Sequence, residues 1–210
     1  MRWNDIKNRL KLRACEILVE TNAISFGSFI LTSGKKSPFY IDMRLIPSFP
    51  NLFNEVCDIY VKLIENEIAE VDRIAGVPTA GLPFATLVSY KLGLPLIYIR
   101  KEKKVHGREK MVEGVLEQGN KVVIIDDLIT TGGSLVTSAK NIREEGGVVE
   151  DVVVFLDREQ GGLENLSKIG VRLHSILKIT ELMKYLYKQN ILDKETYSNC
   201  IRYINEEKVH

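Results

Sequence analysis

Two adjacent carboxylates followed directly by a loop of hydroxyls and glycines are the most informative feature of the chain. The segment is VVIIDDLITTGGS, residues 122–134, in which an apolar run leads into Asp126 and Asp127. Successive glycines let backbone N–H groups converge on an anion, and threonine and serine hydroxyls add donors. The neighbouring carboxylates can accept hydrogen bonds from sugar hydroxyls or hold the water shell of Mg²⁺. The segment therefore predicts a site for a phosphorylated sugar.

A second segment, RKEKKVHG at residues 100–107, concentrates positive charge. Crowded cations repel one another unless an anion offsets them, so the segment is a candidate partner for a multiply charged group. A solvated loop, balanced by Glu102 and Glu109, is the alternative. Gly107 and Gly114 bracket a stretch with little apolar content, which is typical of a mobile flap.

Alternating strands and helices must position these segments. We expect helices over roughly the first 22 residues, with Asn4 as a possible N-cap, and over about 51–69, 80–93, 132–147, 163–170 and the C-terminal tail. We expect strands at 72–77, 95–100, 121–127, 148–157 and 171–177. This order predicts an α/β fold with a doubly wound, mostly parallel sheet flanked by helices, and ligands collect beyond the carboxyl ends of such strands.

Glycines and prolines break the segment from about residue 24 to 50 into short extended pieces. We interpret this segment as a small N-terminal lobe that contains β structure, here called the hood. The predicted organisation is a single domain over 1–210. Its N-terminal helix and hood occupy about 1–50, and its core and C-terminal helices about 51–210.

Composition excludes several classes of protein. The chain has 210 residues, of which 45% are hydrophobic and 27% charged, with a formal net charge of +1. This balance gives no electrostatic reason to expect a nucleic-acid or membrane partner. Cys15, Cys57 and Cys200 have no metal-like spacing and are typical of reduced thiols. Because the N-terminus also has no continuous apolar run, we expect a cytoplasmic protein.

Residues 122–134 resemble the phosphoribosyl pyrophosphate (PRPP) motif of type I phosphoribosyltransferases. The resemblance implies that the ribose 5-phosphate binds in the TTGGS loop and that the ribose hydroxyls meet the two aspartates. It also implies a Mg²⁺ cofactor held by PRPP and by waters near these aspartates, without a direct protein ligand. The implied PRPP contacts here are Asp126, Asp127, Leu128, Ile129, Thr130, Thr131, Gly132, Gly133 and Ser134.

The cationic segment is similar to a loop of orotate phosphoribosyltransferases, which has Arg-Lys, then Lys, then His-Gly. By that match Arg100, Lys101, Lys104 and His106 contact the diphosphate. Lys104 would be the catalytic lysine, acting with Asp126 and Asp127. In that family the loop enters the neighbouring subunit's site, which implies a homodimer. Lys103 is extra to the pattern and has no assigned role.

Two further segments resemble parts of the same family. FILTSGKKSPFYIDMR, residues 29–44, is similar to a signature that closes over the pyrimidine, and FLDREQGG, residues 155–162, contains a matching arginine. The implied orotate contacts are Lys36, Phe39, Tyr40, Thr130 and Arg158. A guanidinium suits the carboxylate and ring carbonyls of orotate. Thr32 and Ala80 stand where some members have lysine, and His174 matches nothing and is interpreted as structural.

The expected activity is therefore transfer of phosphoribosyl from PRPP to orotate. Two alternatives remain open at this point. One is a phosphoribosyltransferase for a purine or another base, because the PRPP motif alone does not name the base. The other is a regulatory protein that binds PRPP as a signal, which would not need the cationic segment intact.

Overall fold

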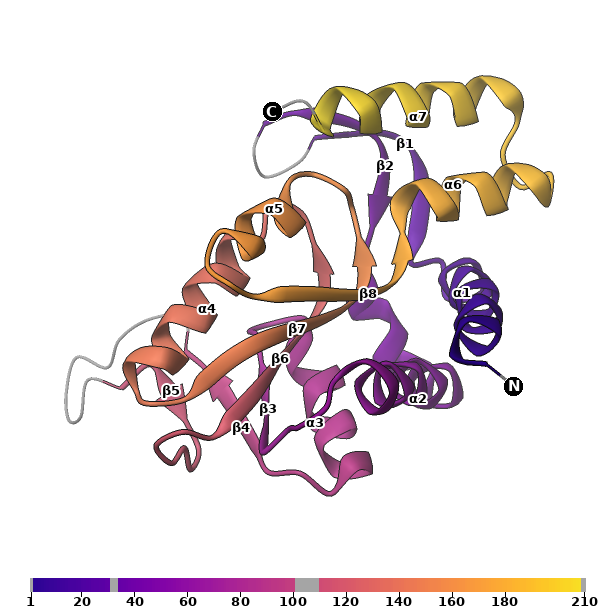
Figure 1. Cartoon of the computed structure of the whole chain (residues 1–210). Helices are drawn as coiled ribbons and strands as arrows, with labels where there is room; N and C mark the ends of the chain where they lie inside the picture. Colours follow the sequence, from indigo (N-terminus) through magenta and orange to yellow (C-terminus); the bar gives the residue numbers. More distant parts are fainter. Residues whose placement is uncertain (1, 31–33, 101–109, 209–210) are drawn as a thin grey trace.

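A computed structural model describes residues 2–30, 34–100 and 110–208. Within these ranges six strands form the central sheet, in the order β5-β4-β3-β6-β7-β8 (Figure 1). The parallel members are β3 (Arg73–Gly76), β4 (Leu96–Ile99), β6 (Lys121–Ile129), β7 (Val148–Asp157) and β8 (Arg172–Lys178). The short strand β5 (Val112–Glu113) pairs antiparallel with β4 at one edge. The predicted doubly wound, mostly parallel α/β fold is confirmed.

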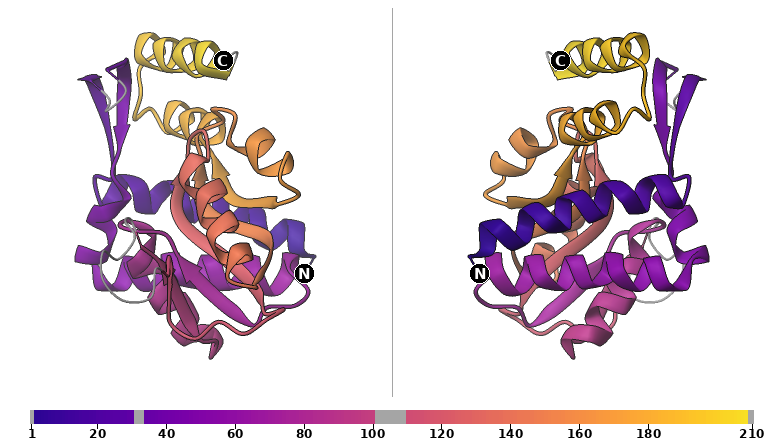
Figure 2. Two further views of the ribbon diagram at one scale, coloured as in Figure 1. Left: turned by 90° about the vertical axis from the view of Figure 1, so that its left-hand side faces the viewer. Right: turned by 90° about the vertical axis from the view of Figure 1, so that its right-hand side faces the viewer.

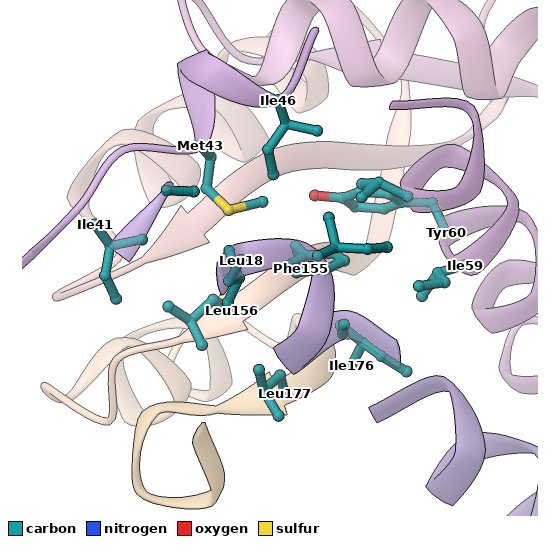
Figure 3. Packing of buried hydrophobic residues seen from close by; sticks show 14 of the residues in the cluster. Leu18, Ile41, Met43, Ile46, Ile59, Tyr60, Phe155, Leu156, Ile176 and Leu177 are labelled. Carbon is teal, nitrogen blue, oxygen red and sulfur yellow. The ribbon is translucent and has the colours of Figure 1, made fainter. Parts of the chain in front are cut away.

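Helices cover both faces of the sheet because neighbouring residues of each strand point to opposite sides. Val123 and Ile125 of β6 face one apolar cluster, whereas Val122 and Ile124 face the other. The first cluster includes residues of α1 (Trp3–Glu20), α2 (Pro50–Glu67), α3 (Gly81–Leu92), α6 (Ile179–Lys188) and α7 (Lys194–Lys208). The second includes residues of α4 (Gly133–Glu144) and α5 (Gly162–Ser167). Figure 3 shows part of the first cluster, in which the rings of Tyr60 and Phe155 lie near each other, with centroids 6.2 Å apart.

The hood is an antiparallel pair of strands, β1 (Ile24–Ile30) and β2 (Lys36–Ile41). A 3₁₀ helix, η1 (Met43–Ser48), leads from it into α2. Figure 2 shows the two strands rising from the core beside the C-terminal helix α7. An ion pair from Lys35 Nζ to Glu207 Oε1, at 3.0 Å, joins the hood to that helix. The end of the chain therefore contributes to the surroundings of the hood.

Two details of the sequence-based prediction are wrong. The helix α1 is preceded by Arg2 as its N-cap, without a side-chain cap hydrogen bond, and Asn4 lies inside its first turn. In the stretch from Gly107 to Gly114 that was expected to be a flap, Val112 and Glu113 instead form β5, which pairs with β4, and Arg100 N donates to Met111 O at 2.8 Å. The sequence does not predict β5, because a strand of two residues is too short to show the alternation of apolar and polar residues that identifies a strand.

In the described ranges no helix combines the length and the apolar character that a membrane crossing requires. Cys15, Cys57 and Cys200 are all buried free thiols. Burial raises the pKa of Cys15 and of Cys57 to about 12. These thiols therefore pack as small apolar side chains.

Replacing Gly81 with alanine is expected to lower the melting temperature by several degrees. A Cβ at this position would lie 2.7 Å from Asp126 Oδ1 and 2.8 Å from Ile125 O, so α3 or β6 must shift. Overpacking of this kind costs about 1–3 kcal/mol, and about 2–4 °C is lost per kcal/mol in a chain of this size. Gly133→Ala is the control, because nothing lies within 4 Å of a Cβ there. Equal melting temperatures for the two variants would contradict the close approach.

Candidate active site

The predicted phosphate loop lies at the carboxyl end of β6 and opens into α4. Residues 77–80 and 126–135 line a cavity of about 330 Å³. Gly132 precedes α4 with φ +77°, a left-handed conformation that glycine adopts without strain. The helix N-terminus therefore points its free N–H groups toward the cavity, where they favour an anion. The structure brings all the residues of the predicted PRPP loop, 126–134, to one cavity.

The two aspartates carry unfavourable negative charge at the mouth of this loop. Asp126 is 7% exposed, and its Oδ1 accepts a hydrogen bond from Asp127 N at 3.0 Å. Burial, and then the charge of Asp127, raises the pKa of Asp126 well above its usual value. Burial also raises the pKa of Asp127. Hydroxyl donors or a cation bound here would relieve this cost.

Two side chains from other elements, one buried and one partly exposed, contact the end of β6 and the loop that follows it. Tyr60 of α2, which is 1% exposed, donates its hydroxyl to Asp126 O at 2.8 Å, and Figure 3 shows its ring beside Phe155. On the other side Asn165 Nδ2 donates to Thr131 O at 3.0 Å. Sequence analysis missed both, because each contacts a segment far away along the chain and belongs to no local motif.

Arg158 follows the adjacent strand β7 and lies next to the loop. Its N–H donates to Ile129 O at 2.9 Å. The side chain is 8% exposed, and its Cζ lies 5.3 Å from the centre of the Phe39 ring in the hood. Burial lowers the pKa of Arg158. Its Nε and Nη2 have no hydrogen-bond partner in the part of the chain that the structure describes. These two donors are therefore available to a ligand that carries acceptor atoms.

The three hood residues with implied roles do not face the same way. Phe39 is buried against Arg158, whereas Tyr40 points to the opposite face of β2 because side chains alternate. Tyr40 Oη accepts a hydrogen bond from Arg44 Nη2 at 3.0 Å. Lys36 is exposed at the start of β2. Phe39 and Tyr40 therefore cannot stack on the same ring from this strand.

Arg44 is a further residue that sequence analysis did not assign. Its Nε donates to Asp42 Oδ1 at 2.6 Å, which fixes the guanidinium, and Asp42 also accepts Arg44 N at 3.1 Å. Arg44 partly opposes the burial that raises the pKa of Asp127. Arg44, at the start of η1, therefore contributes positive charge that favours the ionised form of Asp127. The signal was present, because Arg44 ends the quoted segment FILTSGKKSPFYIDMR.

Part of the cationic segment lies outside the described residues. Lys101, Lys103, Lys104 and His106 fall there, as does Thr32 of the hood. Arg100 is described, and its Nη1 donates to Glu113 Oε1 at 2.5 Å. Ala80 lines the cavity. His174 lies between Glu67 Oε2, at 2.9 Å, and Asp151 Oδ1, at 2.7 Å, so its imidazole joins α2 to the sheet.

The chain is similar to known proteins over most of its length. A family model described as the phosphoribosyl transferase domain matches residues 46–182. The orotate phosphoribosyltransferase of Sulfolobus acidocaldarius is 41% identical over 175 residues, which are 83% of this chain and 87% of that relative. The chain belongs to the orotate phosphoribosyltransferase family.

Two further proteins extend the comparison. Uridine 5′-monophosphate synthase of Bos taurus is 38% identical over 189 residues, which are 90% of this chain and 39% of that protein. The crystal structure of orotate phosphoribosyltransferase from Aeropyrum pernix has a TM-score of 0.76 at 34% identity. That match covers 85% of this chain and 99% of the other. The fold described above is therefore the fold of this family.

Proposed function

We propose that the chain transfers the 5-phosphoribosyl group of PRPP to orotate, which yields orotidine 5′-monophosphate and pyrophosphate for pyrimidine synthesis. The observation that carries this proposal is the direct contact between the phosphate loop and the end of β7, where Arg158 lies. Arg158 N donates to Ile129 O, so an unsatisfied guanidinium lies beside an anion loop. A phosphorylated sugar bound in the loop and a carboxylate-bearing base bound by Arg158 would then lie next to each other.

The loop residues would bind and orient PRPP. Thr130, Thr131 and Ser134 supply hydroxyls, and the start of α4 supplies backbone N–H groups for the 5-phosphate. Asp126 and Asp127 would accept hydrogen bonds from the ribose hydroxyls. The bond from ribose C1 to the pyrophosphate oxygen breaks as the ring nitrogen of orotate forms its bond to C1. The bonding electrons leave with pyrophosphate, and the proton that the ring nitrogen loses passes to pyrophosphate or to solvent. No side-chain nucleophile is required, and the protein contributes mainly positioning.

Arg158 would bind the orotate carboxylate or a ring carbonyl, because a guanidinium offers directed, charged donors. Thr130 adjoins it across the strand ends, and Phe39 packs on the guanidinium. Lys36 and Tyr40 are proposed contacts from the hood. Since the two faces of β2 diverge, one of Phe39 and Tyr40 would meet the base directly and the other would shape the hood.

The donor set fits a Mg²⁺ ion that is held through PRPP and water. Asp126 and Asp127 are neighbouring carboxylates whose pKa values are raised by burial, so a cation bound nearby would relieve the cost of their charge. In the described ranges no three acidic, histidine or cysteine side chains gather as a complete ligand set. The ion would neutralise charge on the diphosphate when bound. The aspartates would orient its water shell, in keeping with the preference of Mg²⁺ for oxygen ligands.

The remaining proposals concern the assembly. We propose that Lys104, together with Arg100, Lys101 and His106, binds the diphosphate of a neighbouring subunit in a homodimer. A single domain over 1–210 would carry all the residues of one such site except the shared loop. Three buried free thiols support a reducing, cytoplasmic location.

The test is the loss of orotate absorbance on addition of PRPP and Mg²⁺. We expect stoichiometric formation of orotidine 5′-monophosphate and pyrophosphate. Product formation with adenine or hypoxanthine but not with orotate would contradict the proposed base. Saturable PRPP binding without turnover of any base would instead identify a PRPP-sensing protein.

A further inference from the structure

The C-terminal helix α7 contacts both sides of the proposed base site. On the hood side, the Tyr203 ring meets the Phe39 ring edge-on, with centroids 5.7 Å apart and an interplanar angle of 85°. On the core side, Lys208 Nζ lies 3.0 Å from Glu159 Oε1, one residue beyond Arg158. Figures 1 and 2 both place α7 beside the hood. The α7 helix thus forms a third side of the proposed base site, besides the hood and the end of β7.

Unsatisfied buried polar atoms gather at this side of the proposed base site. Among the residues the structure describes, Arg158 Nε, Arg158 Nη2 and Tyr203 Oη are buried without a hydrogen-bond partner. Such atoms are rare in folded proteins, because losing water without replacing its hydrogen bonds is unfavourable. Both side chains also contact Phe39, one by its guanidinium and the other by its ring edge. Burial lowers the pKa of Arg158, and the Tyr203 phenol partly opposes this change, which reports their proximity.

The backbone beside Arg158 is also held in an uncommon conformation. Glu159 has φ +56°, in the left-handed region that residues other than glycine rarely adopt. Its Oε2 accepts Thr180 N at 3.0 Å, and its Oε1 pairs with Lys208. Strained residues persist where their surroundings fix them. The α6 and α7 helices therefore fix the direction in which Arg158 leaves β7.

We propose that Tyr203 is a positioning residue for the base, whose hydroxyl oxygen accepts an N–H of Arg158 once the base is bound. This inference rests on the proposed function, because the ligand is the carboxylate-bearing base. A guanidinium has several donors in one plane, so holding one of them directs the others. The Phe39 ring packs on the Arg158 guanidinium and fixes the orientation of its plane. The hydroxyl of Tyr203 would fix the rotation of the guanidinium within that plane. Contacts of this kind shorten when substrate is bound.

Tyr203→Phe removes the hydroxyl and keeps the ring on Phe39. We expect the KM for orotate to rise about tenfold, while the KM for PRPP and kcat stay within about twofold. Tyr197→Phe is the matched control on the same helix, because Tyr197 stacks on Tyr187 with centroids 4.6 Å apart, away from Arg158. An unchanged KM for orotate in Tyr203→Phe would overturn the role. A general loss of folding would instead lower the melting temperature and alter both substrates equally.

A double-mutant cycle with Arg158→Gln tests whether Tyr203 acts through Arg158. Calorimetric binding of orotidine 5′-monophosphate is the readout, because its phosphate keeps binding measurable in weakened variants. We expect Tyr203→Phe to have no further effect once Arg158 is replaced, since contacting residues are not additive. Fully additive losses would overturn the mechanism. If the unsubstituted chain fails to use orotate, the proposed function fails with it. Orotate turnover with an unaffected Tyr203→Phe variant refutes only the positioning role.

Discussion

A chain with alanine in place of Lys104 is expected to have a kcat about 100- to 1000-fold lower than the unsubstituted chain, measured at saturating orotate and PRPP. Pyrophosphate gains negative charge as it departs, and a fixed cation near it stabilises the transition state more than the ground state. Loss of one such preorganised group typically costs about 100- to 1000-fold in kcat. The KM for PRPP should change much less, because the other cations of the segment still bind the diphosphate.

Lys103→Ala is the matched control for this variant. It removes the same side chain from the adjacent position, so general effects of lost charge are equal in the two variants. We expect the control to retain kcat within a few-fold. If Lys104→Ala keeps an unchanged kcat, or if both variants lose activity equally, the assignment of Lys104 is wrong.

The residues that the sequence places together, and that do line one cavity, are contiguous in the chain. Residues 126–134 form a strand end, a loop and a helix start in that order, so local sequence encodes their geometry. The strands 148–157 and 95–100 were found for a similar reason, because each is a run of apolar residues bounded by turns or charge. A parallel sheet then places the carboxyl ends of its strands together.

The missing parts depend on contacts between distant segments. Tyr60 reaches Asp126 across 66 positions, and Tyr203 meets Phe39 only because α7 folds back over the hood. Neither tyrosine lies in a motif, and each has the spacing of an ordinary helix residue. The opposite directions of Phe39 and Tyr40 were, in contrast, available from the alternation of a strand. The resemblance alone implies that both side chains lie near the base, and it carries no information on which face of β2 each one occupies.

The substitution Asp126→Asn is expected to stabilise the ligand-free protein while it impairs the enzyme. The pKa of Asp126 is raised well above its usual value, first by burial and then by the charge of Asp127. Asparagine removes the charge, keeps an Oδ1 that can accept Asp127 N, and adds an amide that can donate to the Asp127 carboxylate. Loss of a charged hydrogen bond to ribose, worth about 1.5–3 kcal/mol, should lower kcat/KM for PRPP by about 10- to 100-fold.

The stabilisation expected from Asp126→Asn depends on pH. Between the usual aspartate pKa of about 3.9 and the raised folded value, the folded state binds more protons at Asp126 than the unfolded state does. The stability of the unsubstituted chain therefore falls as pH rises through this window. Because the asparagine side chain does not titrate, the gain in melting temperature from Asp126→Asn should be near zero below about pH 4 and grow with pH to a plateau.

Melting temperatures of both proteins, measured without ligands from acid to neutral pH, check this expectation. Asp5→Asn is the control, because the Asp5 side chain is 51% exposed and should give a small difference at every pH. A gain that is constant with pH, or a loss at neutral pH, would contradict a strained carboxylate at position 126. A growing gain together with weakened PRPP turnover would mean that the charge is retained for substrate binding, at the expense of the empty protein's stability.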